Sequence, residues 1–242
     1  MELLASAVGP IQTNVYVLAD PATREAIAID TATPCLVWVT NVLVRRGWRL
    51  KLIVSTHGHW DHIGDNAALV AWTREQSEHL AHHAAGEGAG DPLGAEAEAG
   101  EAGEALIAVH PLDRHRLVHP EPISAPFEIP PSIPAVDLAE GGRIRLGEVE
   151  LQVLHTPGHT EGSVCLFEPE AGLLFAGDTL FADGWGRTDL PGGSEEQIIE
   201  SLGRLAGLPD GVRVLPGHGA TTTIGRERPM LERVKATGRL PY

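Results

Sequence analysis

Residues 57–62 of the chain read His-Gly-His-Trp-Asp-His, which places three histidines and one aspartate within six positions. Imidazole nitrogens and carboxylate oxygens are common protein ligands of zinc and of related transition metals. The motif directly follows residues 50–56, a largely apolar run that predicts a buried strand. Structural side chains of this kind at a strand end would each need a polar partner of their own. We therefore interpret the motif as part of a metal site rather than as a solvated turn.

Three later segments share one feature, a predicted strand end followed by a glycine-containing turn with one potential ligand. These ligands are His159, Asp178 and His218. Each alone would be an ordinary turn residue. Together with the first motif they supply five histidines and two aspartates on four loops, enough for two sites of mixed nitrogen and oxygen ligands. Because no cysteine stands at these positions, the pattern favours open, catalytic coordination over a structural zinc site.

The elements that must position these loops alternate along the chain. Strands are predicted over residues 15–19, 26–30, 50–56, 106–109, 143–146, 150–154, 164–167, 173–176 and 212–215. Helices are predicted over residues 34–47, 64–83, 112–118 and 194–205, with one more after His218. Strands followed by helices, twice over, predict an α/β (α+β) protein made of two sheet-plus-helix halves packed sheet to sheet.

Two segments interrupt this order. Residues 84–104 are rich in Ala, Gly and Glu, and we interpret them as a surface insertion, with a lid over the site as the alternative. Residues 120–134 hold six prolines and predict an irregular, stiff stretch. The length of 242 residues predicts one domain over residues 1–242.

Composition excludes several classes of function. With 18 basic and 33 acidic residues the net charge is −15, which argues against nucleic acid as a partner. No apolar run approaches the roughly 20 residues that span a bilayer, and the N-terminus lacks a signal-peptide pattern. Cys35 and Cys165 lie in apolar runs and predict buried thiols in a cytoplasmic protein. We expect a small-molecule substrate and no membrane partner; a homo-oligomer is compatible with the sequence.

The ordered set of potential ligands resembles that of the metallo-β-lactamase superfamily. Residues 156–163, 175–181 and 186–189, which read TPGHTEGS, FAGDTLF and GRTD, are similar to the glyoxalase II-like branch, whose members include hydroxyacylglutathione hydrolases. The resemblance extends over nearly the whole chain as far as Gly219. It implies a four-layer αβ/βα metallo-β-lactamase sandwich with the metals at one edge of the two sheets.

The resemblance also implies a role for each ligand. The first metal would be held by His57, His59 and His159, and the second by Asp61, His62 and His218. Asp178 would bridge the two ions. We expect two divalent ions per chain, zinc first, with iron or manganese as alternatives because the same ligand types accept all three.

Such a site predicts a metal-dependent hydrolase in which a hydroxide shared by both ions attacks a thioester or ester carbonyl. Asp61 and Asp178 would be the catalytic carboxylates, with Asp61 orienting this hydroxide. Trp60, Phe181, Trp185 and Arg187 are candidates for the substrate pocket. The C-terminal helical domain that supplies much of the glutathione site in glyoxalase II has no counterpart after His218, so glutathione specificity is not predicted.

The main alternative is an iron-dependent persulfide dioxygenase, a sister group that would use His57, His159 and Asp178 around one iron. The complete second ligand set favours the hydrolase. A zinc β-lactamase is disfavoured because its commonest forms carry cysteine where Asp178 stands, and a nuclease is disfavoured by the charge. A binding module with a vestigial site is disfavoured by the complete ligand set.

Overall fold

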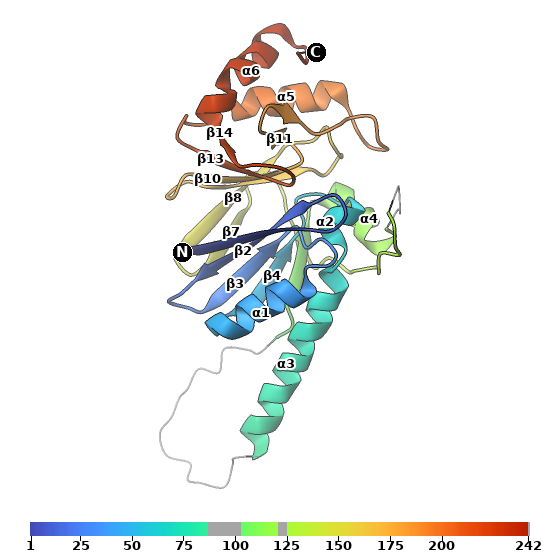
Figure 1. Cartoon of the computed structure of the whole chain (residues 1–242), viewed down its shortest axis with the longest axis vertical. Helices are drawn as coiled ribbons and strands as arrows, with labels where there is room; N and C mark the ends of the chain where they lie inside the picture. The colour runs from blue at the N-terminus through green and yellow to red at the C-terminus, as the bar shows by residue number, and fades with distance from the viewer. Residues whose placement is uncertain (87–102, 121–124, 242) are drawn as a thin grey trace.

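Four layers build the molecule, in the order helices, sheet, sheet, helices (Figure 1). The computed structural model describes residues 1–86, 103–120 and 125–241. No helix within these ranges is both long enough and apolar enough to cross a membrane. The order of the four layers confirms the sandwich that the sequence resemblance implied.

The first sheet takes its strands in chain order, and its members from β3 to β6 run parallel. Its strands are β1 (Glu2–Val8), β2 (Thr13–Asp20), β3 (Glu25–Ile29), β4 (Arg49–Val54), β5 (Leu106–Val109) and β6 (Val136–Asp137). The second sheet has the order β14-β13-β10-β9-β8-β7. Its strands are β7 (Arg143–Leu146), β8 (Val149–His155), β9 (Val164–Glu168), β10 (Leu173–Gly177), β13 (Arg213–Pro216) and β14 (Thr222–Thr223). A small ribbon pairs β11 (Leu180–Phe181) with β12 (Gly184–Trp185).

Helices cover the outer faces of both sheets (Figure 1). On the first sheet lie α1 (Leu36–Arg46) and α3 (Asn66–Gly86), and on the second lie α5 (Glu195–Leu205) and α6 (Ile224–Thr237). Three short helices sit near the ends of strands: α2 (Trp60–Ile63), the 3-10 helix η1 (Pro111–Asp113) and α4 (Arg114–Val118). Gly47 ends α1 in the left-handed conformation, as a glycine after a basic last turn predicts.

The alternation of side chains along the strands produces the layers. In β2, Val15 and Val17 point to the helices, whereas Tyr16 and Leu18 point to the other sheet. In β9, Cys165 faces the helices on the second sheet while its neighbours face the first sheet. Both faces of each sheet are therefore buried, which explains why these strands read as nearly continuous apolar runs.

Strand direction brings the four candidate loops together. In the second sheet β8, β10 and β13 run the same way, because β9 is antiparallel to both β8 and β10. The carboxyl end of β4 in the first sheet meets the same edge of the sandwich, where the amide of Val164 donates to the carbonyl of Thr56 at 2.9 Å. One edge of the sandwich therefore collects the loops that carry the predicted ligands.

The structure differs from the predicted elements in a few places. Strands β1, β6, β11, β12 and β14 are absent from the prediction. The helix predicted over 64–83 begins at Asn66 and continues to Gly86, so the prediction that the insertion starts as a loop at residue 84 is wrong for its first three residues. The remainder of that insertion, residues 87–102, lies outside the described residues.

We expect the substitution Ser194→Ala to lower the free energy of unfolding by about 1 kcal/mol. The Ser194 hydroxyl accepts a hydrogen bond from the amide of Gln197 at 3.3 Å and so satisfies a free N–H at the start of α5. Urea denaturation followed by circular dichroism measures the change. Ser6→Ala, at a hydroxyl with no hydrogen bond among the described residues, is the control and should differ by less than about 0.5 kcal/mol. An equal effect of the two substitutions would contradict the capping role.

Candidate metal centre

All seven predicted ligands lie at the edge where the strand ends meet. Three groups of side chains there have donor atoms within 4.8 Å of one another. They are His57–His59–His159, Asp61–His62–His218 and His57–His62–Asp178. The structure thus brings together every residue that the sequence analysis proposed as a ligand.

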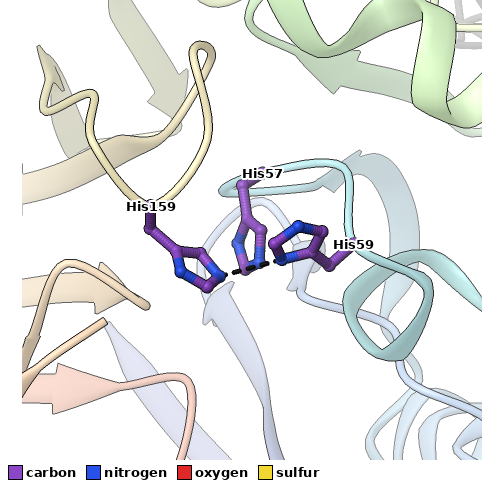
Figure 2. A group of neighbouring side chains, drawn as sticks. All are labelled: His57, His59 and His159. Atoms are coloured by element: carbon purple, nitrogen blue, oxygen red, sulfur yellow. Dashed lines mark hydrogen bonds between the residues drawn. The ribbon is translucent and has the colours of Figure 1, made fainter. Parts of the chain in front are cut away.

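The first group comes from two loops on different sheets (Figure 2). His57 and His59 follow β4, and His159 follows β8. Nδ1 of His59 lies 2.8 Å from Nε2 of His159. On its other side, Nδ1 of His159 donates to the carbonyl of Arg187 at 2.7 Å. Because a carbonyl can only accept, that contact leaves Nε2 of neutral His159 with a free lone pair for a cation.

The second group combines α2 with the loop after β13. Oδ2 of Asp61 lies 3.1 Å from Nε2 of His62 and 3.1 Å from Nε2 of His218. Nδ1 of His218 donates to the carbonyl of Ile11 at 3.2 Å, which again leaves Nε2 as the free nitrogen. Nδ1 of His62 lies 3.1 Å from the buried carboxylate of Asp30. His218 is therefore oriented by a carbonyl behind it, and His62 has a carboxylate behind it.

Asp178 lies between the two groups. Its Oδ1 is 3.5 Å from Nε2 of His62, and its Oδ2 is 3.5 Å from Nε2 of both His159 and His218. Gly217 leaves room for this approach, because a Cβ there would collide with Oδ1 of Asp178 and with the His62 ring. A carboxylate in contact with both groups has the position that a bridging ligand needs.

Burial keeps His57 and His59 neutral. The pKa of His57 is lowered well below its usual value by burial and by the neighbouring histidines His62 and His159. Burial, His159 and His62 lower the pKa of His59 to about 3. Neutral imidazoles keep the lone pairs that bind a metal ion.

The second group favours positive charge instead. Burial alone would lower the pKa of His62, but the carboxylates of Asp61, Asp178 and Asp30 raise it well above its usual value. Burial would raise the pKa of Asp61, yet the contacts with His62 and His218 lower it. Three carboxylates around one histidine thus stabilise a cation at this position.

Unpartnered atoms test whether these residues suit metal ions. Nε2 of His57 and Oδ1 of Asp178 are buried and have no hydrogen-bond partner among the described residues. Leaving buried polar atoms unpaired costs free energy. A divalent ion between the nitrogen and oxygen donors would satisfy them, and the donor set is one that zinc, iron and manganese accept. The residues therefore suit divalent metal ions.

A cavity of about 570 Å³ opens onto both groups. It is lined by Ile11, Gly58, His59, Trp60, Asp61, Arg116, His159, Asp178, Phe181, Trp185, Arg187, Leu190 and His218. All four pocket candidates from the sequence are in this lining. Trp60 does two things at once, since it lines the cavity and also packs edge-to-face on Phe127 with ring centroids 5.7 Å apart. The guanidinium of Arg187 is engaged by Asp189 through two contacts of 2.6 Å, and both side chains are largely exposed.

Sequence reasoning missed three of the lining residues. Ile11 belongs to the turn between β1 and β2, Arg116 to α4, and Leu190 to the loop before α5. None lies within a ligand motif, so only the tertiary packing brings them to the site. His110 lies outside the ligand motifs, is buried at 9% exposure and stacks on His155 with ring centroids 4.1 Å apart.

We expect both thiols to be inert in the native protein. Burial raises the pKa of Cys165 to about 11, and burial and Asp65 raise the pKa of Cys35. At pH 8, Ellman's reagent should therefore find no reactive thiol in the folded chain and two per chain in denaturant. A fast-reacting thiol in the folded chain, with loss of activity on labelling, would contradict the assignment of both cysteines to the core.

Comparisons with known sequences identify the family to which the chain is similar. Residues 8–218 match the family model of the metallo-β-lactamase superfamily. An uncharacterised protein of Aquifex aeolicus is 36% identical over 227 residues, 91% of each chain. The hydroxyacylglutathione hydrolase of Maricaulis maris is 32% identical over 211 residues, which are 87% of this chain and 64% of that protein.

Solved structures share the fold. The BLEG-1 B3 metallo-β-lactamase aligns with a TM-score of 0.76 at 29% identity, over 96% of this chain and 99% of that one. TTHA1623 in a di-iron-bound form aligns with a TM-score of 0.71 at 31% identity, over 93% of this chain and 96% of that one. ETHE1 from Myxococcus xanthus aligns with a TM-score of 0.70 at 26% identity, over 98% of this chain and 85% of that one.

Proposed function

The chain belongs to the metallo-β-lactamase superfamily, and we propose that it is a hydrolase that uses two divalent ions to cleave a thioester or ester. The convergence of two ligand groups on Asp178, in the lining of one cavity, carries this proposal. The likeness to hydroxyacylglutathione hydrolases supports the acyl chemistry. We propose zinc as the ion, with iron as the first alternative in view of the di-iron structure.

When bound, the two ions lower the pKa of a shared water and polarise the acyl carbonyl. The chain's own residues supply the rest of the chemistry. His57, His59 and His159 would hold one ion, and Asp61, His62 and His218 the other. Asp178 would contact both. The Asp61 carboxylate keeps its Oδ2 among His62, His218 and the Thr13 hydroxyl, which fixes the direction of its second oxygen.

The walls of the cavity indicate the kind of substrate. Trp60, Phe181 and Trp185 give apolar surface beside the donor groups, and Ile11 and Leu190 extend it. Such walls suit the carbon chain of a small acyl compound, whereas ions held by the ligand groups would polarise its carbonyl. Since the chain spans 64% of the hydroxyacylglutathione hydrolase that it matches, glutathione is not part of the proposal.

Metal content and thioester cleavage together test the proposal. Protein purified without chelators should contain about two ions per chain by elemental mass spectrometry. It should release thiol from simple acyl thioesters, lose this activity when dipicolinate removes the ions, and regain it with zinc, iron or manganese. Failure to bind metal after reconstitution, or no cleavage by the two-metal form on a broad panel of thioesters and esters, would overturn it.

The likeness to ETHE1 supports a second candidate, an iron-dependent persulfide dioxygenase. His57, His159 and Asp178 would supply the two imidazoles and one carboxylate of such a site. About one iron per chain, together with oxygen uptake on glutathione persulfide, would favour this candidate over the hydrolase. We place it second because the ligands of a second metal group, Asp61, His62 and His218, lie together beside this site.

A further inference from the structure

Asp113 is a buried carboxylate that contacts the candidate centre from outside it. It ends the 3-10 helix η1 and has no exposed surface. Its Oδ2 accepts hydrogen bonds from the amide of Gly58 and the hydroxyl of Thr160, both at 2.7 Å. Its Oδ1 accepts from the amide of Gly162 at 2.9 Å and lies 3.6 Å from Nε of Arg116. A carboxylate removed from water to this degree is stabilised by such donors.

The donors around Asp113 belong to the loops of one ligand group. Gly58 stands between His57 and His59, and Thr160 directly follows His159. The three histidines converge from these two loops in Figure 2. One carboxylate therefore joins the loop after β4 to the loop after β8, which belong to different sheets.

Two glycines make this close contact possible. A Cβ on Gly162 would lie 2.6 Å from Cγ of Asp113, and a Cβ on Gly58 would lie 2.6 Å from Cβ of Arg116. Real side chains do not approach this closely, so both positions need glycine for η1 and α4 to lie against the loops. The two glycines therefore serve the contact with this helical segment.

The other ligand group is supported by a different part of the chain. The Thr13 hydroxyl contacts Asp61, and the carbonyl of Ile11 accepts from His218. The loop that carries His218 is also held by Asn14, whose amide donates to the carbonyl of Gly217 at 2.7 Å. These contacts all come from the β1–β2 turn and the start of β2. Among the described residues, the side-chain hydrogen bonds of Asp113 reach the loops of the three-histidine group only.

We propose that Asp113 is a positioning residue that sets the metal affinity of the His57–His59–His159 site and not that of the Asp61–His62–His218 site. This inference rests on the metal-binding part of the proposed function, because it takes both groups to bind metal. Without the carboxylate, three buried donors lose their acceptor and the two loops are no longer joined, so the three imidazoles need not converge. Partners behind metal ligands typically change metal affinity ten- to a hundred-fold.

Metal titration of the metal-free protein tests the proposal on Asp113→Asn, which keeps the shape but turns one acceptor into a donor. Zinc binding is measured by competition with a chromophoric chelator, and cobalt binding by its visible absorption. We expect the metal affinity of the His57–His59–His159 site to fall about ten- to a hundred-fold. The affinity of the other site should change less than about threefold. Under a competing chelator the zinc content should fall from two ions per chain to one. The absorption of cobalt in the three-histidine site should be the part that is lost.

Two further variants keep the test decisive. Thr160→Val removes one of the three hydrogen bonds and should weaken the same site by a few-fold, even if Asp113→Asn folds poorly. Asp137→Asn changes an exposed aspartate on β6 that forms an ion pair with Arg114. This change should leave both metal affinities unchanged. Equal weakening of both sites, or no weakening of either, would overturn the proposal. Because the readout is metal binding without substrate, two intact sites that cleave no thioester would refute the proposed function and leave this inference standing.

Discussion

Replacing Asp178 with asparagine is expected to lower kcat/KM for thioester cleavage by about a thousand-fold or more, equivalent to at least about 4 kcal/mol of transition-state stabilisation. Asp178 is the carboxylate that contacts His159 of one group and His62 and His218 of the other, each at 3.5 Å. The amide keeps the shape but loses the negative charge and replaces an acceptor oxygen with an NH₂ group. We expect the variant to bind fewer ions as well as to react more slowly.

The measurement is initial rate against thioester concentration, together with metal content of the same sample. Asp183→Asn is a matched control, because Asp183 is an exposed aspartate five residues along the chain that pairs with Arg226 at 2.6 Å. Its left-handed backbone, with φ of 63°, is one that asparagine also adopts. If Asp178→Asn kept more than about a tenth of the activity with full metal content, a bridging carboxylate would not be needed for the reaction.

Much of the fold follows from local patterns. The apolar runs that become β2, β4, β9 and β10 are buried on both faces, and short runs bounded by turns predict such strands well. Strand β1 was missed because it is half-exposed and alternates weakly, so its pairing with β2 decides its conformation. The two-residue strands β6, β11, β12 and β14 have too few residues for any period to be visible.

The candidate ligands were predictable for a different reason. Each lies just after a strand, and parallel strands place such positions at one edge of the sandwich. Asp113 and Arg116 have no such signal, because they lie on a short helical segment 47 and 45 residues before their partners Thr160 and Glu161. The sequence signal for this contact is a pair of glycines, Gly58 and Gly162. A glycine beside a ligand indicates a close approach, but it does not say which residue approaches.

Replacing His218 with alanine is expected to separate the two candidate chemistries. For the two-metal hydrolase we expect kcat/KM on a thioester to fall about a hundred- to a thousand-fold, and the metal content to fall from two ions per chain to one. The reason is that His218 belongs to the second group, where its Nε2 lies 3.1 Å from Asp61 and 3.3 Å from His62. Removing it leaves the second group with only Asp61 and His62 as ligands.

An iron dioxygenase would respond differently to the same change. Its ligands would be His57, His159 and Asp178, and of these His218 approaches Asp178 at 3.5 Å. Oxygen uptake on a persulfide should then stay within a few-fold of the unaltered protein, with iron still bound. His119→Ala, at an exposed histidine away from the centre, controls for the loss of an imidazole. The same variant is assayed on both substrates. If it still cleaved thioesters with a single ion bound, the two-metal mechanism would be refuted, although the hydrolase activity would stand.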